Sequence, residues 1–180
     1  MNEPNIMIFL LVILTLLLLW AAISDIARFR IPNAACLAIA LLFFPYFISK
    51  SLEQEFSFGQ LSWHLGISFS FLLFGFMLFA GNFLGAGDAK LLAALGLWAG
   101  KEYGLFVLFA TVMAGGLLIC LMRLIYIARL WRSDGTAIFL HKLVLGTLGG
   151  WQQPAPYGVA LATGGVLLVY QELLKIIYPS

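Results

Sequence analysis

The sequence predicts an all-α, polytopic integral membrane protein with about six transmembrane helices, in a single domain over residues 1–180. Hydrophobic residues make up 63% of the chain and charged residues only 10%, whereas charged residues are about 25% of a typical soluble domain. The apolar residues also gather into runs long enough to cross a bilayer. We therefore expect a lipid bilayer as the environment. No soluble nucleic-acid-binding module is recognisable, so no nucleic-acid partner is expected.

The first predicted span is Ile6–Ile23, in which Thr15 is the one polar residue. A helix of this length measures about 27 Å, which is enough to cross the hydrocarbon core. A cleaved signal peptide is the alternative interpretation. It fits poorly, because Met1–Asn5 contains Glu3 and no Lys or Arg, and the apolar run is long for a signal sequence. We expect a retained first helix.

The second and third predicted spans are Ala34–Ile48 and Leu61–Ala80, with a polar connection from Lys50 to Gln60 between them. Pro32 suits the first turn of the second helix, where its missing N–H is not needed. Pro45 interrupts that helix late.

The fourth predicted span is a short helix, Leu91–Ala99, that ends at Gly100, and the fifth is Leu105–Ile127. The sixth is Pro156–Tyr178. Ala137–Leu148 is interpreted as an interfacial or re-entrant segment. Two pairs of glycines are interpreted as points where helices pack closely, because small residues let spans approach: Gly115 with Gly116, and Gly164 with Gly165.

The distribution of cationic residues predicts that both termini face outside. With the N-terminus outside, seven Lys and Arg residues fall on the cytoplasmic side and three on the external side, as the positive-inside rule requires. This orientation also places Asp25 and Asp88 on the same, cytoplasmic, face. The cytoplasmic set is Arg28, Arg30, Lys90, Arg123, Arg129, Arg132 and Lys142, and the external set is Lys50, Lys101 and Lys175.

The segment from Gly85 to Lys90 places an aspartate and a lysine between two apolar runs. Charged groups in a membrane segment are costly, so they tend to be functional or to lie at its edge. The glycines Gly85 and Gly87 are expected to allow positive φ and the close approach of a second chain. A turn with charges that reach the interface is the alternative interpretation.

A second aspartate, Asp25, ends the first predicted span, while Asp88 begins the fourth. If those helices touch, the two carboxyls can share one water. Two close carboxyls do not both ionise readily, so one keeps its proton while the other acts as a general base. Such a pair could hydrolyse a peptide bond with water as the nucleophile, without a side-chain nucleophile, a metal or a cofactor. Cys36 and Cys120 form no C-x-x-C pair, and His64 has no partner at metal spacing, so no metal site is expected.

Three motifs resemble the type IV prepilin peptidases, a family of membrane aspartyl proteases. Gly85–Leu91 matches the family pattern G-x-G-D-x-K-L, and Asp25 precedes an Ile-Pro-Asn at 31–33, as in the family's first-aspartate segment. Pro156–Ala160 resembles the opening of the family's last helix. The three motifs occur in the family's order over nearly the whole chain.

The resemblance implies cleavage of a short, basic leader from prepilins, whose hydrophobic N-terminal helix follows the leader. It implies a multi-pass protein of the bacterial inner membrane with its site facing the cytoplasm. Asp25 and Asp88 are the implied catalytic pair. The implied supporting residues are Gly85, Gly87, Lys90, Pro32 and Asn33.

The roles of two supporting residues stay open. Lys90 either stabilises the charge of Asp88 or is an ordinary cytoplasmic charge near lipid headgroups. Asn33 either fixes the bend after Pro32 or supports Asp25.

The sequence departs from the larger members of the family in two respects. It lacks the paired C-x-x-C motifs of their zinc-binding insertion, and it lacks the added N-terminal region that is associated with methylation of the new N-terminus. It resembles the short form associated with tight-adherence (Flp-type) pili, so methyltransferase activity is not expected.

Two alternative functions remain. A protease of the presenilin or signal-peptide-peptidase type is one, but those proteins pair G-x-G-D with Tyr-Asp, whereas Ser24 precedes Asp25 here. The other is a non-enzymatic, proton-coupled transporter or a membrane subunit of pilus assembly. A proton-coupled transporter is expected to have its acidic residues near the middle of the membrane, whereas both aspartates lie at helix ends.

The predicted orientation can be tested with reporter fusions. A reporter fused after Arg132 should be active as a cytoplasmic fusion, and one fused after Glu53 as an external fusion, because of the charge difference between the loops. The opposite pattern in the two fusions would contradict the orientation and put both aspartates outside.

Overall fold

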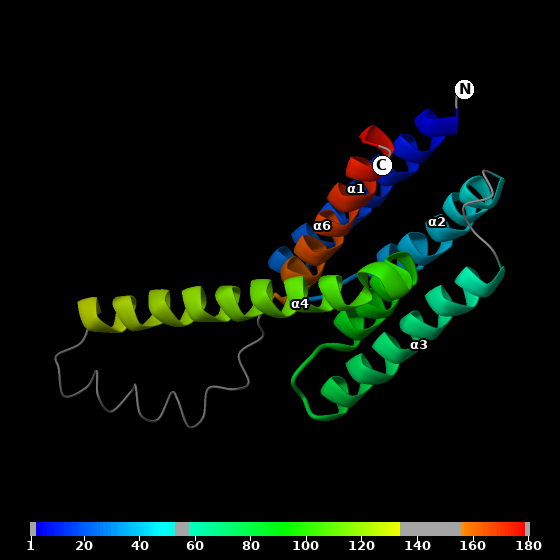
Figure 1. Ribbon diagram of the computed structural model, residues 1–180. Coiled ribbons are helices and arrows are strands. Elements are labelled where there is room, and N and C mark those ends of the chain that lie inside the picture. The colour runs from blue at the N-terminus through cyan, green and yellow to red at the C-terminus, as the bar shows by residue number, and fades with distance from the viewer. Residues whose placement is uncertain (1–2, 53–57, 134–155, 179–180) are drawn as a thin grey trace.

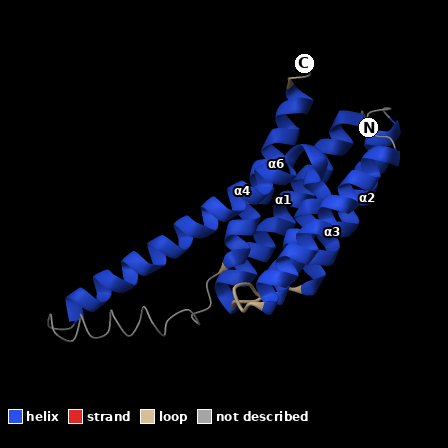
Figure 2. Ribbon diagram, turned by 60° about the horizontal axis from the view of Figure 1, so that its bottom comes forward, coloured by secondary structure: helices blue, strands red, loops and turns tan. Residues whose placement is uncertain are grey.

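A computed structural model describes residues 3–52, 58–133 and 156–178 of the chain. Every regular element in these ranges is a helix (Figures 1 and 2). The segment Ala137–Leu148, interpreted above as interfacial or re-entrant, lies outside the described residues. The helices are α1 (Glu3–Arg28), α2 (Asn33–Leu52), α3 (Phe58–Ala80), α4 (Ala86–Ser133) and α6 (Tyr157–Ile177).

Helix α1 buries one stripe of side chains along its length. Leu11, Leu14, Leu18 and Ala21 are fully buried, and their spacing of three or four residues places them on one face of the helix. Asp25 follows in the same spacing and is only 4% exposed. The aspartate is therefore turned into the bundle by the register of the apolar stripe that precedes it.

The first part of α4 lies in the middle of the bundle, in contact with α2 and α3, while α4 as a whole also contacts α6. Every residue from Leu91 to Gly100 is buried. Two hydrogen bonds tie this part to its neighbours: Trp98 Nε1 donates to the carbonyl of Ile39 on α2 (2.8 Å), and Ser68 Oγ on α3 donates to the carbonyl of Ala93 (2.9 Å).

Helix α4 is broken at Gly100, which has φ 53° and ψ −157°. Only glycine adopts this region readily. The ring of His64 on α3 fills the space beside the break, and its Nδ1 lies 2.7 Å from the carbonyl oxygen of Leu97. A carbonyl only accepts, so Nδ1 is the donor. A side chain that hydrogen-bonds into the helix ladder is a recognised cause of a kink.

After the break, α4 turns back along α6 toward the end of the bundle that holds Asp25. A Cβ on Gly164 of α6 would lie 3.2 Å from the carbonyl of Val107, and a Cβ on Gly115 of α4 would lie 3.5 Å from Ala160. Contacts on α4 thus move toward the start of α6 as residue numbers rise. Figure 1 shows this second part of α4 leaving the break in a new direction and extending beyond the other helices.

The predicted end of a helix at Gly100 is confirmed, and so is an all-helical chain with several membrane-length helices. Within the described residues, five helices are long and apolar enough to cross a membrane, and α4 counts as one of them across its kink. The count of six spans and the orientation stay predictions. Close packing is confirmed at Gly115, Gly164 and Gly165, but it is wrong for Gly116, which has nothing within 4 Å of a built Cβ.

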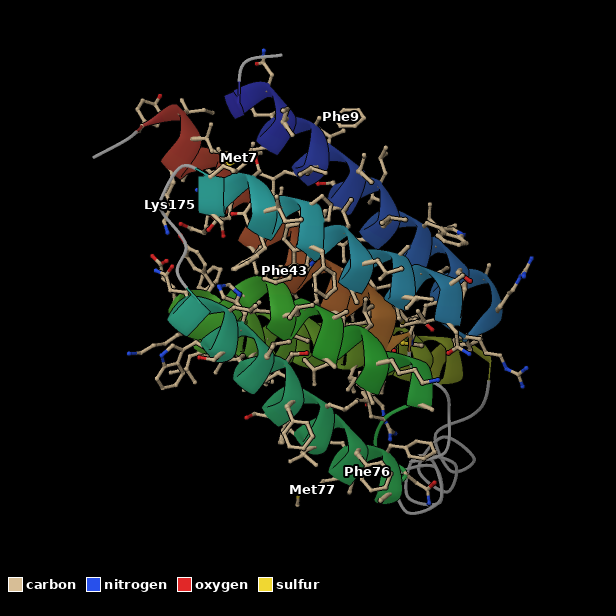
Figure 3. The ribbon with its side chains drawn as sticks, turned by 90° about the vertical axis from the view of Figure 1, so that its right-hand side faces the viewer. Met7, Phe9, Phe43, Phe76, Met77 and Lys175 are labelled. Atoms are coloured by element: carbon tan, nitrogen blue, oxygen red, sulfur yellow. The ribbon has the colours of Figure 1, made fainter. Side chains whose placement is uncertain are left out.

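The outer surface is apolar, as a lipid-facing surface requires. Phe9, Phe76 and Met77 are 57%, 60% and 72% exposed, and Figure 3 shows them pointing away from the bundle. Phe43 of α2, by contrast, is fully buried in the centre. Large exposed aromatic side chains are unusual in a soluble protein but ordinary in contact with hydrocarbon.

The charged residues separate to the two ends of the bundle. At the end away from Asp25, Lys175 of α6 pairs with Glu102 of α4 (2.7 Å), and Tyr46 Oη donates to Glu172 (2.6 Å). Figure 3 shows Lys175 near Met7, toward the beginning of α1. Arg28, Arg30 and Lys90 lie at the other end, which is the grouping of charges that the sequence predicted.

Replacement of Gly100 by Ala should destabilise the fold. A built Cβ would lie 2.5–2.7 Å from the ring of His64, and the backbone conformation costs a non-glycine residue about 1–3 kcal/mol. We expect a lower midpoint of thermal unfolding in detergent. Gly116→Ala on the same helix is the control and should not lower the midpoint, because a Cβ there meets open space. Equal midpoints for both variants would contradict the assigned role of the break.

Candidate active site

Asp25 lies in the last turns of α1 and is held by the beginning of α6. The backbone N–H of Gly158 donates to Asp25 Oδ2 at 2.7 Å. Pro156, the N-cap residue of α6, makes no capping hydrogen bond with its own side chain. The carboxyl of Asp25 therefore satisfies a first-turn N–H of a helix that is far away in the sequence. The positive end of the α6 dipole also favours a negative charge there.

Asp88 lies in the first turn of α4 and is 8% exposed. The N–H of Gly85, just before the helix, donates to Asp88 Oδ2 at 3.1 Å. A Cβ on Gly85 would lie 2.8 Å from that oxygen, so the absence of a side chain is what allows the contact. The second oxygen, Oδ1, is buried without a hydrogen-bond partner among the described residues.

The structure brings the two aspartates together. They lie at the same end of the bundle, on either side of Ile31, although 63 positions separate Asp25 from Asp88 in the chain. Ile31 lies between the two helix beginnings that carry the site: a Cβ on Gly87 would lie 3.2 Å from Ile31 Cβ, and a Cβ on Gly158 would lie 2.9 Å from Ile31 Cδ1. Helices α1 and α4 make no direct backbone contact in the described chain, and α2 and α6 each contact both of them, so the expected direct contact between the first and fourth predicted helices is not confirmed.

The expected reason for the two glycines is wrong. Gly85 and Gly87 were expected to adopt positive φ, but among the described glycines only Gly100 does. Gly85 gives space to the carboxyl of Asp88, and Gly87 gives space to Ile31. Both glycines therefore allow another group to approach closely. In each case that group belongs to the same chain: the carboxyl of Asp88 at Gly85, and Ile31 at Gly87.

The remaining supporting residues join α2 to α4 beside the aspartates. Lys90 Nζ donates to Asn33 Oδ1 at 2.9 Å, so Asn33 contacts Lys90 and not Asp25. Pro32 lies immediately before α2 and not in its first turn, and its carbonyl accepts from the N–H of Ala35 at 3.0 Å. The thiol of Cys36 lies 3.7 Å from the carbonyl of Gly87. These contacts fix the start of α4 against the start of α2.

Three residues at the site carried no predicted role: Gly158, Ile31 and Cys36. The opening of the last helix at Pro156 was a signal for Gly158, since a helix beginning offers unsatisfied N–H groups. In the described part of the chain, no three side chains of His, Cys, Asp or Glu gather as a metal site would require.

Two buried carboxyls at the beginning and end of apolar helices, each held by one backbone amide, form a candidate hydrolytic site. A sequence model described as the type IV leader peptidase family matches residues 12–120, which include Asp25 and Asp88 and more than half of the chain. The chain belongs to the type IV leader peptidase family.

Family membership confirms the predicted resemblance and supports peptidase activity on type IV prepilins. Together with the five helices of membrane length found in the described part of the chain, it also supports a membrane protein. Comparisons with curated proteins and with solved structures give no match.

Replacement of Gly87 by Val should lower leader cleavage by about 10- to 100-fold, because a branched side chain would push Ile31 away from the site and displace Asp88. The measurement is the rate at which the purified, membrane-inserted variant cleaves a prepilin. Gly66→Val on α3 is the matched control and should keep normal activity, since a Cβ there meets nothing within 4 Å. Full activity of Gly87→Val would show that Ile31 and Asp88 tolerate the displacement.

Proposed function

We propose that this protein is an aspartic endopeptidase that removes the leader peptide of Flp-type prepilins at the cytoplasmic face of the bacterial inner membrane. Asp25 and Asp88 are the proposed catalytic residues, and the proposed co-reactant is one water molecule. No cofactor is part of the proposal.

One observation carries this proposal: two buried carboxyls, Asp25 on α1 and Asp88 on α4, lie on either side of Ile31, and Asp25 is held by the start of α6. Each accepts one backbone N–H through Oδ2, so each has its second oxygen available for chemistry. Two buried carboxyls that share one site favour a state in which the pair holds a single proton. That state provides a base and an acid at the same time.

The proposed reaction uses both members of the pair. Asp25 is held by an amide at the positive end of α6 and is suited to remain ionised, so it takes a proton from the water. The water oxygen adds to the scissile carbonyl carbon. Asp88, with Oδ1 unpartnered, donates its proton to the carbonyl oxygen. The C–N bond then breaks as Asp25 gives its proton to the leaving nitrogen and a hydroxyl of the tetrahedral intermediate returns a proton to Asp88.

The position of the pair suits a substrate with an apolar helix. Asp25 and Asp88 lie at the ends of apolar segments, at the end of the bundle that also holds Arg28, Arg30 and Lys90. A substrate whose leader precedes a hydrophobic helix can keep that helix in the bilayer while its cleavage site reaches the carboxyls. The proposed orientation toward the cytoplasm rests on the charge distribution, and the proposed Flp-type substrate rests on the prepilin-peptidase motifs without the paired C-x-x-C motifs between them.

A proton-coupled transporter is the weaker candidate. It would use the same carboxyls to carry protons, but the family match favours a peptidase. We propose cleavage without methylation of the new N-terminus, and the mass of the product formed in the presence of a methyl donor tests that point.

Asp25→Asn and Asp88→Asn test the mechanism, because each removes one ionisable group with little change of shape. Each variant should lose cleavage by at least about 100-fold, since acid–base catalysis contributes that much or more. The double variant should be little worse than either single variant, because groups that act as a unit are not additive. The measurement is prepilin cleavage by variants that insert normally, scored by a mobility shift.

Other treatments separate this mechanism from its rivals. Cleavage should fall at high pH, where both carboxyls lose their protons, and it should resist chelators and serine-directed reagents. Substantial cleavage by correctly inserted Asp25→Asn would overturn the two-aspartate mechanism. Inhibition by a chelator would point to a metal-dependent enzyme.

A further inference from the structure

The contact between Gly158 and Asp25 requires glycine. A Cβ at position 158 would lie 2.9 Å from Asp25 Oδ2 and 3.0 Å from Asp25 Cβ, closer than real Cβ contacts. Any other residue would push α6 away from α1. The hydrogen bond from the Gly158 amide, at 2.7 Å, would then lengthen, and the carboxyl would lose the group that holds its orientation.

Ile31 touches both halves of the site. Its Cβ and carbonyl face Gly87 in the first turn of α4, at 3.2 and 3.3 Å from a built Cβ, while its Cδ1 faces Gly158 in the first turn of α6. The side chain is 8% exposed. It therefore fills the space between the helix that carries Asp88 and the helix that holds Asp25.

The segment around Ile31 is itself constrained. Ser24 Oγ donates to the carbonyl of Arg30 at 3.1 Å, and the N–H of Phe29 donates to the carbonyl of Asp25 at 2.8 Å. Pro32 follows directly and has a fixed φ. Ile31 is thus held by the chain on both sides, which suits a spacer that must not move.

We propose that Gly158 and Ile31 are positioning residues for the aspartate pair. The amide of Gly158 fixes the carboxyl of Asp25, and the side chain of Ile31 sets the spacing between the first turns of α6 and α4. This inference rests on the proposed aspartic mechanism. A displacement of about 1 Å at a catalytic group can cost about 100-fold in rate, so small changes at either residue should be visible in kcat.

The experiment measures kcat and KM for prepilin cleavage by the purified full-length protein in detergent. Ile31→Ala and Gly158→Ala should each lower kcat by about 10- to 100-fold, with KM within about twofold of the parent. Ile31→Val keeps Cβ, which faces Gly87, and loses only Cδ1, which faces Gly158, so its loss of kcat should be smaller than that of Ile31→Ala. The controls are Ile48→Ala, exposed on α2, and Gly116→Ala, in open space; both should behave as the parent protein does.

A double variant separates positioning from general stability. In the double variant Gly158→Ala with Ile31→Val, the new Cβ at position 158 no longer collides with Cδ1 of residue 31. The kcat of the double variant should therefore exceed that of Gly158→Ala alone by about threefold. Two independent losses of stability would instead make the double variant worse. Thermal unfolding in detergent accompanies each measurement, and kcat is compared between variants that are folded at the assay temperature.

Full kcat in Ile31→Ala would overturn the proposal, and so would equal losses in Ile31→Ala and Ile31→Val. If Gly158→Ala does not insert, the two Ile31 variants decide. Asp25→Asn and Asp88→Asn are measured in the same assay. If both are inactive while Ile31→Ala and Gly158→Ala are normal, the positioning proposal alone fails. If Asp25→Asn is active, the aspartic mechanism fails.

Discussion

The hydrogen bond from the Gly158 amide to Asp25 is the contact on which the arrangement of this bundle depends most. It joins the end of α1 to the beginning of α6 and supplies α6 with a cap that its own sequence does not provide. With that end fixed, α6 can pack along both neighbours: a Cβ on Gly165 would lie 2.7 Å from Leu18 of α1 and 2.8 Å from Leu95 of α4. The same carboxyl thus serves the fold and the proposed chemistry.

The sequence was sufficient to predict the helices and the positions of both aspartates. Long apolar runs in a chain with so few charges usually form membrane helices, because a helix satisfies the backbone hydrogen bonds in lipid. The ends of those runs place Asp25 and Asp88 at helix boundaries. The buried stripe of α1 continues to Asp25 in a constant spacing, so even the direction in which this carboxyl faces could be read from the pattern. The grouping of cationic residues gave the reason to place both aspartates at one end.

The contacts within the site could not be predicted from the same pattern. Glycine offers both positive φ and close approach, and a sequence does not distinguish these uses; at Gly85 and Gly87 the structure uses the second. The sequence left two interpretations open for Lys90 and two for Asn33. In the structure these two side chains hydrogen-bond to each other. Such pairings depend on how the starts of α2 and α4 lie against each other. The contacts of Ile31 with Gly87 and Gly158, and of His64 with Gly100, also depend on how the helices pack. The sequence alone gives no sign of either contact.

The break at Gly100 has a consequence for how the chain fits the thickness of a membrane. The apolar part of α4, Ala86–Ile125, would measure about 60 Å as a straight helix, twice the roughly 30 Å of a hydrocarbon core. A straight α4 would carry half of its apolar length into water. The change of direction at Gly100 divides α4 into two arms, each of them shorter than the whole apolar stretch and closer to the thickness of a single hydrocarbon layer. This one backbone conformation therefore decides that the second arm runs back toward the end of the bundle that holds Asp25.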